Sequence, residues 1–145
     1  MPGNESTAKL LGYAGLIPFV VFSAGSWVPL TYVSDATAML ISYAAVILAF
    51  MGAIHWGVAM ANNADLATRY FIVSVIPALL AWLALQLPQL LALVVLLSGF
   101  IGLFIYDRAV AKAQLFPGWY IPMRIRLTFI VALCLTASLV SVSLK

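Results

Sequence analysis

The chain has 145 residues, of which 66% are hydrophobic and 8% are charged, and its formal net charge is +3. Because roughly a quarter of the residues of a soluble domain are charged, this composition excludes an ordinary soluble protein and predicts an integral membrane protein. The positive charge does not indicate nucleic-acid binding, because the basic residues fall at the ends of apolar runs, where they set membrane orientation and meet lipid headgroups.

Several apolar runs approach or exceed the ~20 residues that an α-helix needs to cross a bilayer, and none shows the alternating strands of a barrel. We therefore predict an all-α fold, a single membrane domain built as a bundle of five transmembrane helices. The predicted spans cover residues 8–28, 36–61, 70–87, 89–106 and 127–144. Pro18 and Pro77 fall inside the first and third spans, and we expect a kink near Pro18.

The basic residues are distributed unevenly between the two ends of the predicted bundle. With five spans, only Lys145 falls at one end, and the other six basic residues share the opposite end: Lys9, Arg69, Arg108, Lys112, Arg124 and Arg126. Short loops rich in Lys and Arg stay in the cytoplasm, so this distribution predicts a cytoplasmic N-terminus and a C-terminus outside.

His55 is the only histidine of the chain, and it lies inside the second predicted span. It is six residues from Ala61 at the cytoplasmic end of that span, which corresponds to about 9 Å along the helix axis. Ionisable side chains at membrane depth usually face the interior of a bundle or a wet cavity, so His55 is the first candidate for a functional residue.

Small residues predict which face of the second span packs against other helices. Ala45, Gly52 and Ala59 recur every seven residues, and His55 falls on nearly the same face, so we expect it to point at neighbouring helices. Trp56 is turned about 100° away. The alternative to a functional role is a buried imidazole that bonds a backbone carbonyl or a hydroxyl of an adjacent span.

A second polar group gathers at the same end of the predicted bundle. Asp107 ends the fourth span, and Arg124 and Arg126 precede the fifth. In an antiparallel helix pair these segments meet, so an ion pair between Asp107 and either arginine is expected. The alternative is that the arginines extend toward the lipid headgroups and only fix the topology.

Joining the two regions gives a sharper hypothesis, a small polar cavity open to the inside, with His55 at its floor and the charges of Asp107, Arg124 and Arg126 at its rim. Such a cavity would suit an anionic headgroup, a quinone ring or a proton relay. The candidate ligand-binding residues are therefore His55, Trp56, Asp107, Trp119, Tyr120, Arg124 and Arg126.

The sequence offers little for other chemistry. One histidine and one cysteine, Cys134, on different spans do not make a metal site, so we expect no metal and no cofactor. With a single histidine as a base and no paired acid, no catalytic residue is assigned, and an enzymatic activity is the least favoured of the functions considered.

Four stretches of the chain carry a family resemblance: Gly52–Gly57, Ile76–Trp82, Asp107-Arg108 and Trp119–Thr128. In these stretches the chain resembles the transmembrane protein 69-like family, small bacterial and mitochondrial membrane proteins with a domain of unknown function. Met123 stands where the family pattern tends to have Leu. The resemblance implies a multi-pass protein of a bacterial inner (cytoplasmic) membrane, because the short N-terminus lacks an Arg-rich transit peptide. It implies no established activity.

Two functions are therefore carried forward. The first is a non-enzymatic protein that binds a lipid or another hydrophobic ligand, or helps assemble a membrane complex, through the inward-facing region around His55. The alternative is a small proton-coupled carrier with His55 as the titrating group. The expected partners are the lipid bilayer and a hydrophobic small molecule or membrane protein. Oligomers are permitted by close-packing glycines such as Gly99 and Gly102.

Overall fold

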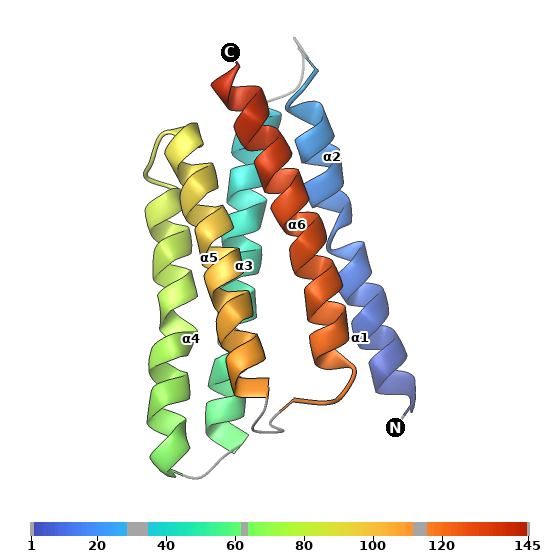
Figure 1. Ribbon diagram of the computed structural model, residues 1–145, viewed down its shortest axis with the longest axis vertical. Helices are drawn as coiled ribbons and strands as arrows, with labels where there is room; N and C mark the ends of the chain where they lie inside the picture. The colour runs from blue at the N-terminus through green and yellow to red at the C-terminus, as the bar shows by residue number, and fades with distance from the viewer. Residues whose placement is uncertain (1, 29–34, 62–63, 112–115, 145) are drawn as a thin grey trace.

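The computed structural model describes residues 2–28, 35–61, 64–111 and 116–144. Within these ranges it is helical with no β-strand, and the helices are α1 Pro2–Ala14, α2 Ile17–Gly25, α3 Ala36–Ala61, α4 Ala64–Ala84, α5 Gln89–Ala111 and α6 Tyr120–Ser143. Figure 1 shows α1 and α2 following one path, after which the helices alternate in direction, and the two termini lie at opposite ends. The predicted all-α bundle with five passes is confirmed.

Four segments of the described chain are long and apolar enough to cross a membrane, and they are Glu5–Gly25, Ala36–Ala61, Gln89–Val110 and Tyr120–Ser143. The fifth pass, α4, has a shorter apolar stretch, Thr68–Ala84. The whole of α4 has 21 residues, which is about 31 Å at the rise of an α-helix and therefore matches the hydrocarbon thickness.

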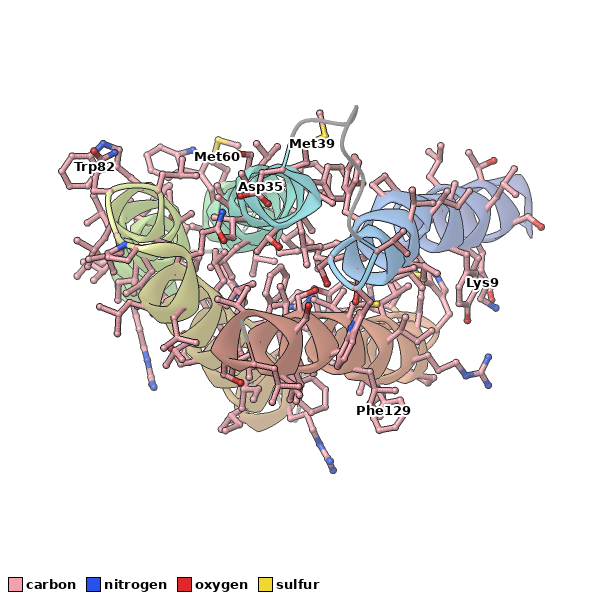
Figure 2. All side chains as sticks on the ribbon, turned by 90° about the horizontal axis from the view of Figure 1, so that it is seen from above. Lys9, Asp35, Met39, Met60, Trp82 and Phe129 are labelled. Carbon is pink, nitrogen blue, oxygen red and sulfur yellow. The ribbon has the colours of Figure 1, made fainter. Side chains whose placement is uncertain are left out.

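The outer surface of the bundle is apolar, as a protein solvated by lipid requires. Met60, Trp82 and Phe129 point away from the helices in the view of Figure 2, and they are 69%, 62% and 63% exposed. A soluble monomer rarely leaves so many large apolar side chains uncovered. The exposed side chains therefore support the membrane location that the composition predicts.

The first pass is broken, as expected from Pro18. α1 ends at Ala14 and α2 begins at Ile17, so Pro18 falls in the first turn of α2, where its missing N–H costs nothing. The Tyr43 hydroxyl of α3 donates a hydrogen bond of 2.9 Å to the carbonyl oxygen of Gly15 in the break. In lipid every backbone polar group needs a partner inside the protein, and Tyr43 supplies this one.

Helices α3 and α4 pack tightly at Gly52. A Cβ atom on Gly52 would lie 2.8 Å from the carbonyl oxygen of Ser74 and 2.9 Å from the ring of Pro77. Ala45 and Ala59, one heptad on either side, are both buried, so the predicted packing stripe of α3 is confirmed. This contact fixes the rotation of α3 and thereby turns His55 into the bundle.

Helix α6 starts earlier than predicted, at Tyr120 rather than at residue 127. The prediction treated Arg124 and Arg126 as flanking charges outside the helix. Pro122 is tolerated because it occupies the first turn of the helix. The extra turns place Arg124 inside the bundle, where it finds a partner on α5.

At the opposite end, α2 and α6 are joined by serine hydroxyls. The Ser23 hydroxyl donates to the carbonyl oxygen of Cys134 at 2.9 Å, and the Ser141 hydroxyl donates to the carbonyl oxygen of Ser26 at 2.7 Å. Small polar residues of this kind hold membrane helices close together. The contact between α1 and α6 is slight by comparison.

Candidate functional site

Three buried side chains from three helices meet near the basic end of the bundle. His55 of α3, Asp107 of α5 and Arg124 of α6 are 0%, 1% and 2% exposed. Nε of Arg124 donates to Oδ2 of Asp107 at 2.8 Å, and Nε2 of His55 lies 2.8 Å from Oδ1. We call these residues the ionic cluster. The predicted pairing of Asp107 with an arginine is confirmed, and the partner is Arg124.

The two contacts of Asp107 differ in quality. The Arg124 contact is a well-aligned hydrogen bond, whereas Nε2 of His55 is close to Oδ1 without the alignment of a hydrogen bond. Distance alone therefore places His55 in the cluster, and we regard the Arg124–Asp107 bond as the stronger contact. A buried carboxylate and guanidinium stabilise each other only when paired, so Asp107 and Arg124 depend on one another.

Aromatic rings enclose the imidazole of His55. The rings of Tyr70, Tyr106 and Phe116 have their centroids 6.1, 5.2 and 6.1 Å from that of His55. The sequence interpretation missed these residues. Tyr70 could have been found, because His55 is six residues before the end of α3 at Ala61 and Tyr70 is six residues after the start of α4 at Ala64.

A cavity of about 340 Å³ lies beside the cluster, between α1, α3 and α6. Its walls are mainly apolar, with Leu11 and Gly12 from α1 and Phe50 and Ile54 from α3. Leu11 and Phe50 are also 66% and 65% exposed on the outer surface of the bundle. We call this space the lateral cavity, because its wall includes side chains that face the lipid.

The wall that α6 contributes to the lateral cavity contains polar residues of the cluster region. Tyr120, Arg124 and Thr128 all line the cavity, and they are 7%, 2% and 5% exposed. Among the residues that the structure describes, Nη2 of Arg124, the hydroxyl of Tyr120 and Oγ1 of Thr128 have no hydrogen-bond partner. The Tyr120 hydroxyl lies close to the carboxylate of Asp107 without an aligned hydrogen bond. Three buried polar atoms without partners are unusual at one place.

The lateral cavity differs from the polar cavity expected from the sequence. His55 does not line it but contacts Asp107 instead, and the lining is apolar except on α6. Thr128 was not predicted, although it is one helical turn beyond Arg124 and so shares its face.

The structure does not bring all predicted site residues together. Trp119 and Tyr120 line the lateral cavity with Arg124. Trp56 is 46% exposed and packs its ring against Phe71 of α4, as expected for a residue turned away from the packing stripe. Arg126 is exposed, and one of its guanidinium nitrogens lies 3.4 Å from the Tyr13 hydroxyl.

No metal centre is evident in the part of the chain that the structure describes, where no three His, Cys, Asp or Glu side chains come together. The Asp107 carboxylate has one histidine and one arginine around it, and a guanidinium does not bind cations.

The fold and its buried charges define a multi-pass helical membrane protein with an ionic cluster in its interior. Residues 4–140 match the family described as a protein of unknown function (DUF3429), and the chain belongs to that family. It is 34% identical over 140 residues to transmembrane protein 69 of Xenopus tropicalis. That match covers 94% of this chain and 54% of the relative, so the chain spans about half the relative's length. No solved structure shows significant similarity.

Proposed function

We propose that this protein binds a hydrophobic small molecule in the lateral cavity, without catalysing a reaction on it. The observation that carries the proposal is an apolar cavity of about 340 Å³ whose wall contains the buried Arg124. Ligand sites typically enclose ~300–1,000 Å³ and combine apolar walls with a few convergent polar groups. The lateral cavity has both features.

The position of the cavity supports entry from the membrane. Leu11 of α1 and Phe50 of α3 belong both to its wall and to the lipid-facing surface. A ligand dissolved in the bilayer would reach Arg124 between these two helices without crossing water. α1 has few contacts with the rest of the bundle, so it is the helix that can move to admit a ligand.

We also propose the inner membrane of a bacterium as the location, with the N-terminus in the cytoplasm. Lys9, Arg69, Arg108, Arg124 and Arg126 fall on segments that meet at one end of the bundle in Figure 1. Lys112 and Lys145 lie outside the described residues. In this orientation the lateral cavity occupies the inner half of the membrane.

Cavity-filling substitutions test the proposal. Ala8 lines the cavity and Ala14, on the same helix, is exposed and does not. Native mass spectrometry of the gently solubilised protein would look for copurifying small molecules in wild type, Ala8→Trp and Ala14→Trp. We expect a bound molecule in wild type and Ala14→Trp and at least a tenfold loss in Ala8→Trp. Equal occupancy of all three folded proteins would contradict binding in this cavity.

A proton-coupled carrier is the second candidate, and the close contact between His55 and Asp107 supports it. In a carrier, His55 would take up and release protons while Asp107 orients the ring. Proton flux into reconstituted vesicles should then fall when His55 becomes Ala. Flux that is the same in both proteins, or no flux above empty vesicles, would exclude this function.

A further inference from the structure

We infer that the lateral cavity selects an uncharged head group bearing a hydrogen-bond acceptor, such as a carbonyl oxygen, on an apolar body. This inference rests on the proposed binding function and adds the chemical class of the ligand. It follows from which polar atoms beside the cavity lack partners and from how the charge of Arg124 is already compensated.

Each of the three atoms of the cavity wall without a partner among the described residues can donate a hydrogen bond. Nη2 of Arg124 can only donate, and the hydroxyls of Tyr120 and Thr128 can each donate or accept. A buried donor without an acceptor is costly, and the cavity is the adjoining space in which an acceptor can be placed. These atoms are covered in the structure, so a bound head group requires the three side chains to turn toward the cavity. An oxygen with two lone pairs would satisfy two of these donors at once.

The charges argue against an anionic head. Arg124 is the cation in the cavity wall, and it is bonded to the carboxylate of Asp107 through Nε. A ligand carboxylate or phosphate on Nη2 would bring a second negative charge close to Asp107 in a medium of low dielectric constant. The paired cluster therefore presents donors without excess positive charge.

The size of the cavity limits the body of the ligand. About 340 Å³ is near the lower end of the volume range of small-molecule sites. This volume suits a ring with a short chain, or one end of an acyl chain, with the remainder lying among the lipids beside Leu11 and Phe50. A quinone and an acyl ester both have an uncharged carbonyl group on an apolar body, so the experiment must distinguish between them.

A pair of photoreactive probes with the same chain, one with a charged and one with an uncharged head group, tests the inference. Dodecanoate and its methyl ester, each with a diazirine on the chain, are crosslinked to the protein in nanodiscs of zwitterionic phosphatidylcholine at pH 8. Crosslinked peptides are quantified for α3 and α6, and labelling of Ala8→Trp is subtracted as the background. We expect the ester to label wild type at least tenfold more than the acid does.

Two variants separate charge from hydrogen bonding. Asp107→Asn keeps the shape of the side chain but leaves the charge of Arg124 uncompensated, so labelling by the acid should rise severalfold while labelling by the ester does not. Thr128→Val removes one hydroxyl, and labelling by the ester should fall about threefold to tenfold. Arg126→Gln, two residues from Arg124 and exposed, is the control and should leave both probes unchanged.

Each result has a defined meaning. Equal or stronger labelling of wild type by the acid would overturn the uncharged head while leaving a ligand-binding cavity. Labelling by neither probe above the Ala8→Trp background would overturn the proposed function itself. If Asp107→Asn does not fold, the wild-type ratio and the Thr128→Val result still decide the question. Protection from ester labelling by a short-chain benzoquinone, compared with a diacylglycerol, identifies which of the two carbonyl sources the cavity prefers.

Discussion

Arg124 donates from Nε to Oδ2 of Asp107 across 2.8 Å, joining two helices at a position where the residues are 2% and 1% exposed. The bond is made inside the bundle, so neither charge can turn to water when its partner is removed. This relation explains why an arginine that begins a membrane helix is buried rather than extended to the headgroups.

A double-mutant cycle measures the bond between Asp107 and Arg124. We expect Asp107→Leu or Arg124→Leu alone to lower the free energy of unfolding by about 3–5 kcal/mol, because each leaves a buried charge unpaired. The double variant should lose less than either single variant. Denaturant unfolding in detergent micelles would measure these differences, with Arg126→Leu as the exposed control. Additive losses would show that the two side chains do not stabilise each other.

The close approach of α3 and α4 predicts a glycine-specific effect. Gly52→Ala places a methyl group against the Ser74 carbonyl and the Pro77 ring, so it should destabilise by about 1–3 kcal/mol. Gly57 is on the same helix, and a Cβ atom added there would meet nothing within 4 Å. Gly57→Ala should therefore be neutral or slightly stabilising. Thermal unfolding in one detergent compares the two, and equal losses would argue against the tight contact.

The hydrogen bond at the break between α1 and α2 predicts the effect of removing a hydroxyl. Tyr43→Phe leaves the Gly15 carbonyl without its partner and should cost about 0.6–1 kcal/mol. Tyr13→Phe removes a hydroxyl from a more exposed position of α1 and should change stability by less than about 0.5 kcal/mol. Hydrogen exchange should also rise at the start of α2 in Tyr43→Phe, and unchanged exchange there would contradict a structural role for the bond.

Orientation is tested by labelling with a membrane-impermeant maleimide in intact bacterial cells. In a Cys134→Ala background, Ser143→Cys near the C-terminus should react from outside, whereas Ser6→Cys should react only after the membrane is opened. This outcome follows from the basic residues clustered at the end that contains α1. The reverse pattern would show that the N-terminus lies outside.

Much of the fold could be predicted from the sequence, because hydropathy and proline positions are local signals. The packing stripe of α3 was readable from Ala45, Gly52 and Ala59, since helical periodicity alone decides which residues share a face. The inward direction of His55 and the outward direction of Trp56 follow from the same periodicity.

The partner of Asp107 was only half predictable. Arg124 and Arg126 are two residues apart, about 200° around a helix, so only one of them can face α5. Which one does so depends on where α6 begins and how it is rotated, and these are decided by packing. The lateral cavity depends on how α1, α3 and α6 are placed relative to one another, which no local pattern encodes. The position of Thr128 in the cavity wall was unpredictable for the same reason.

The three residues of the ionic cluster are synthesised at different times, because they lie on helices that emerge from the ribosome one after another. His55 is inserted first, Asp107 follows with α5, and Arg124 arrives with the last helix of the described chain. During this interval Asp107 has His55 within reach but lacks the hydrogen bond from Arg124. A chain that stops before α6 therefore leaves this buried side chain without the partner that joins α5 to the last helix of the described chain.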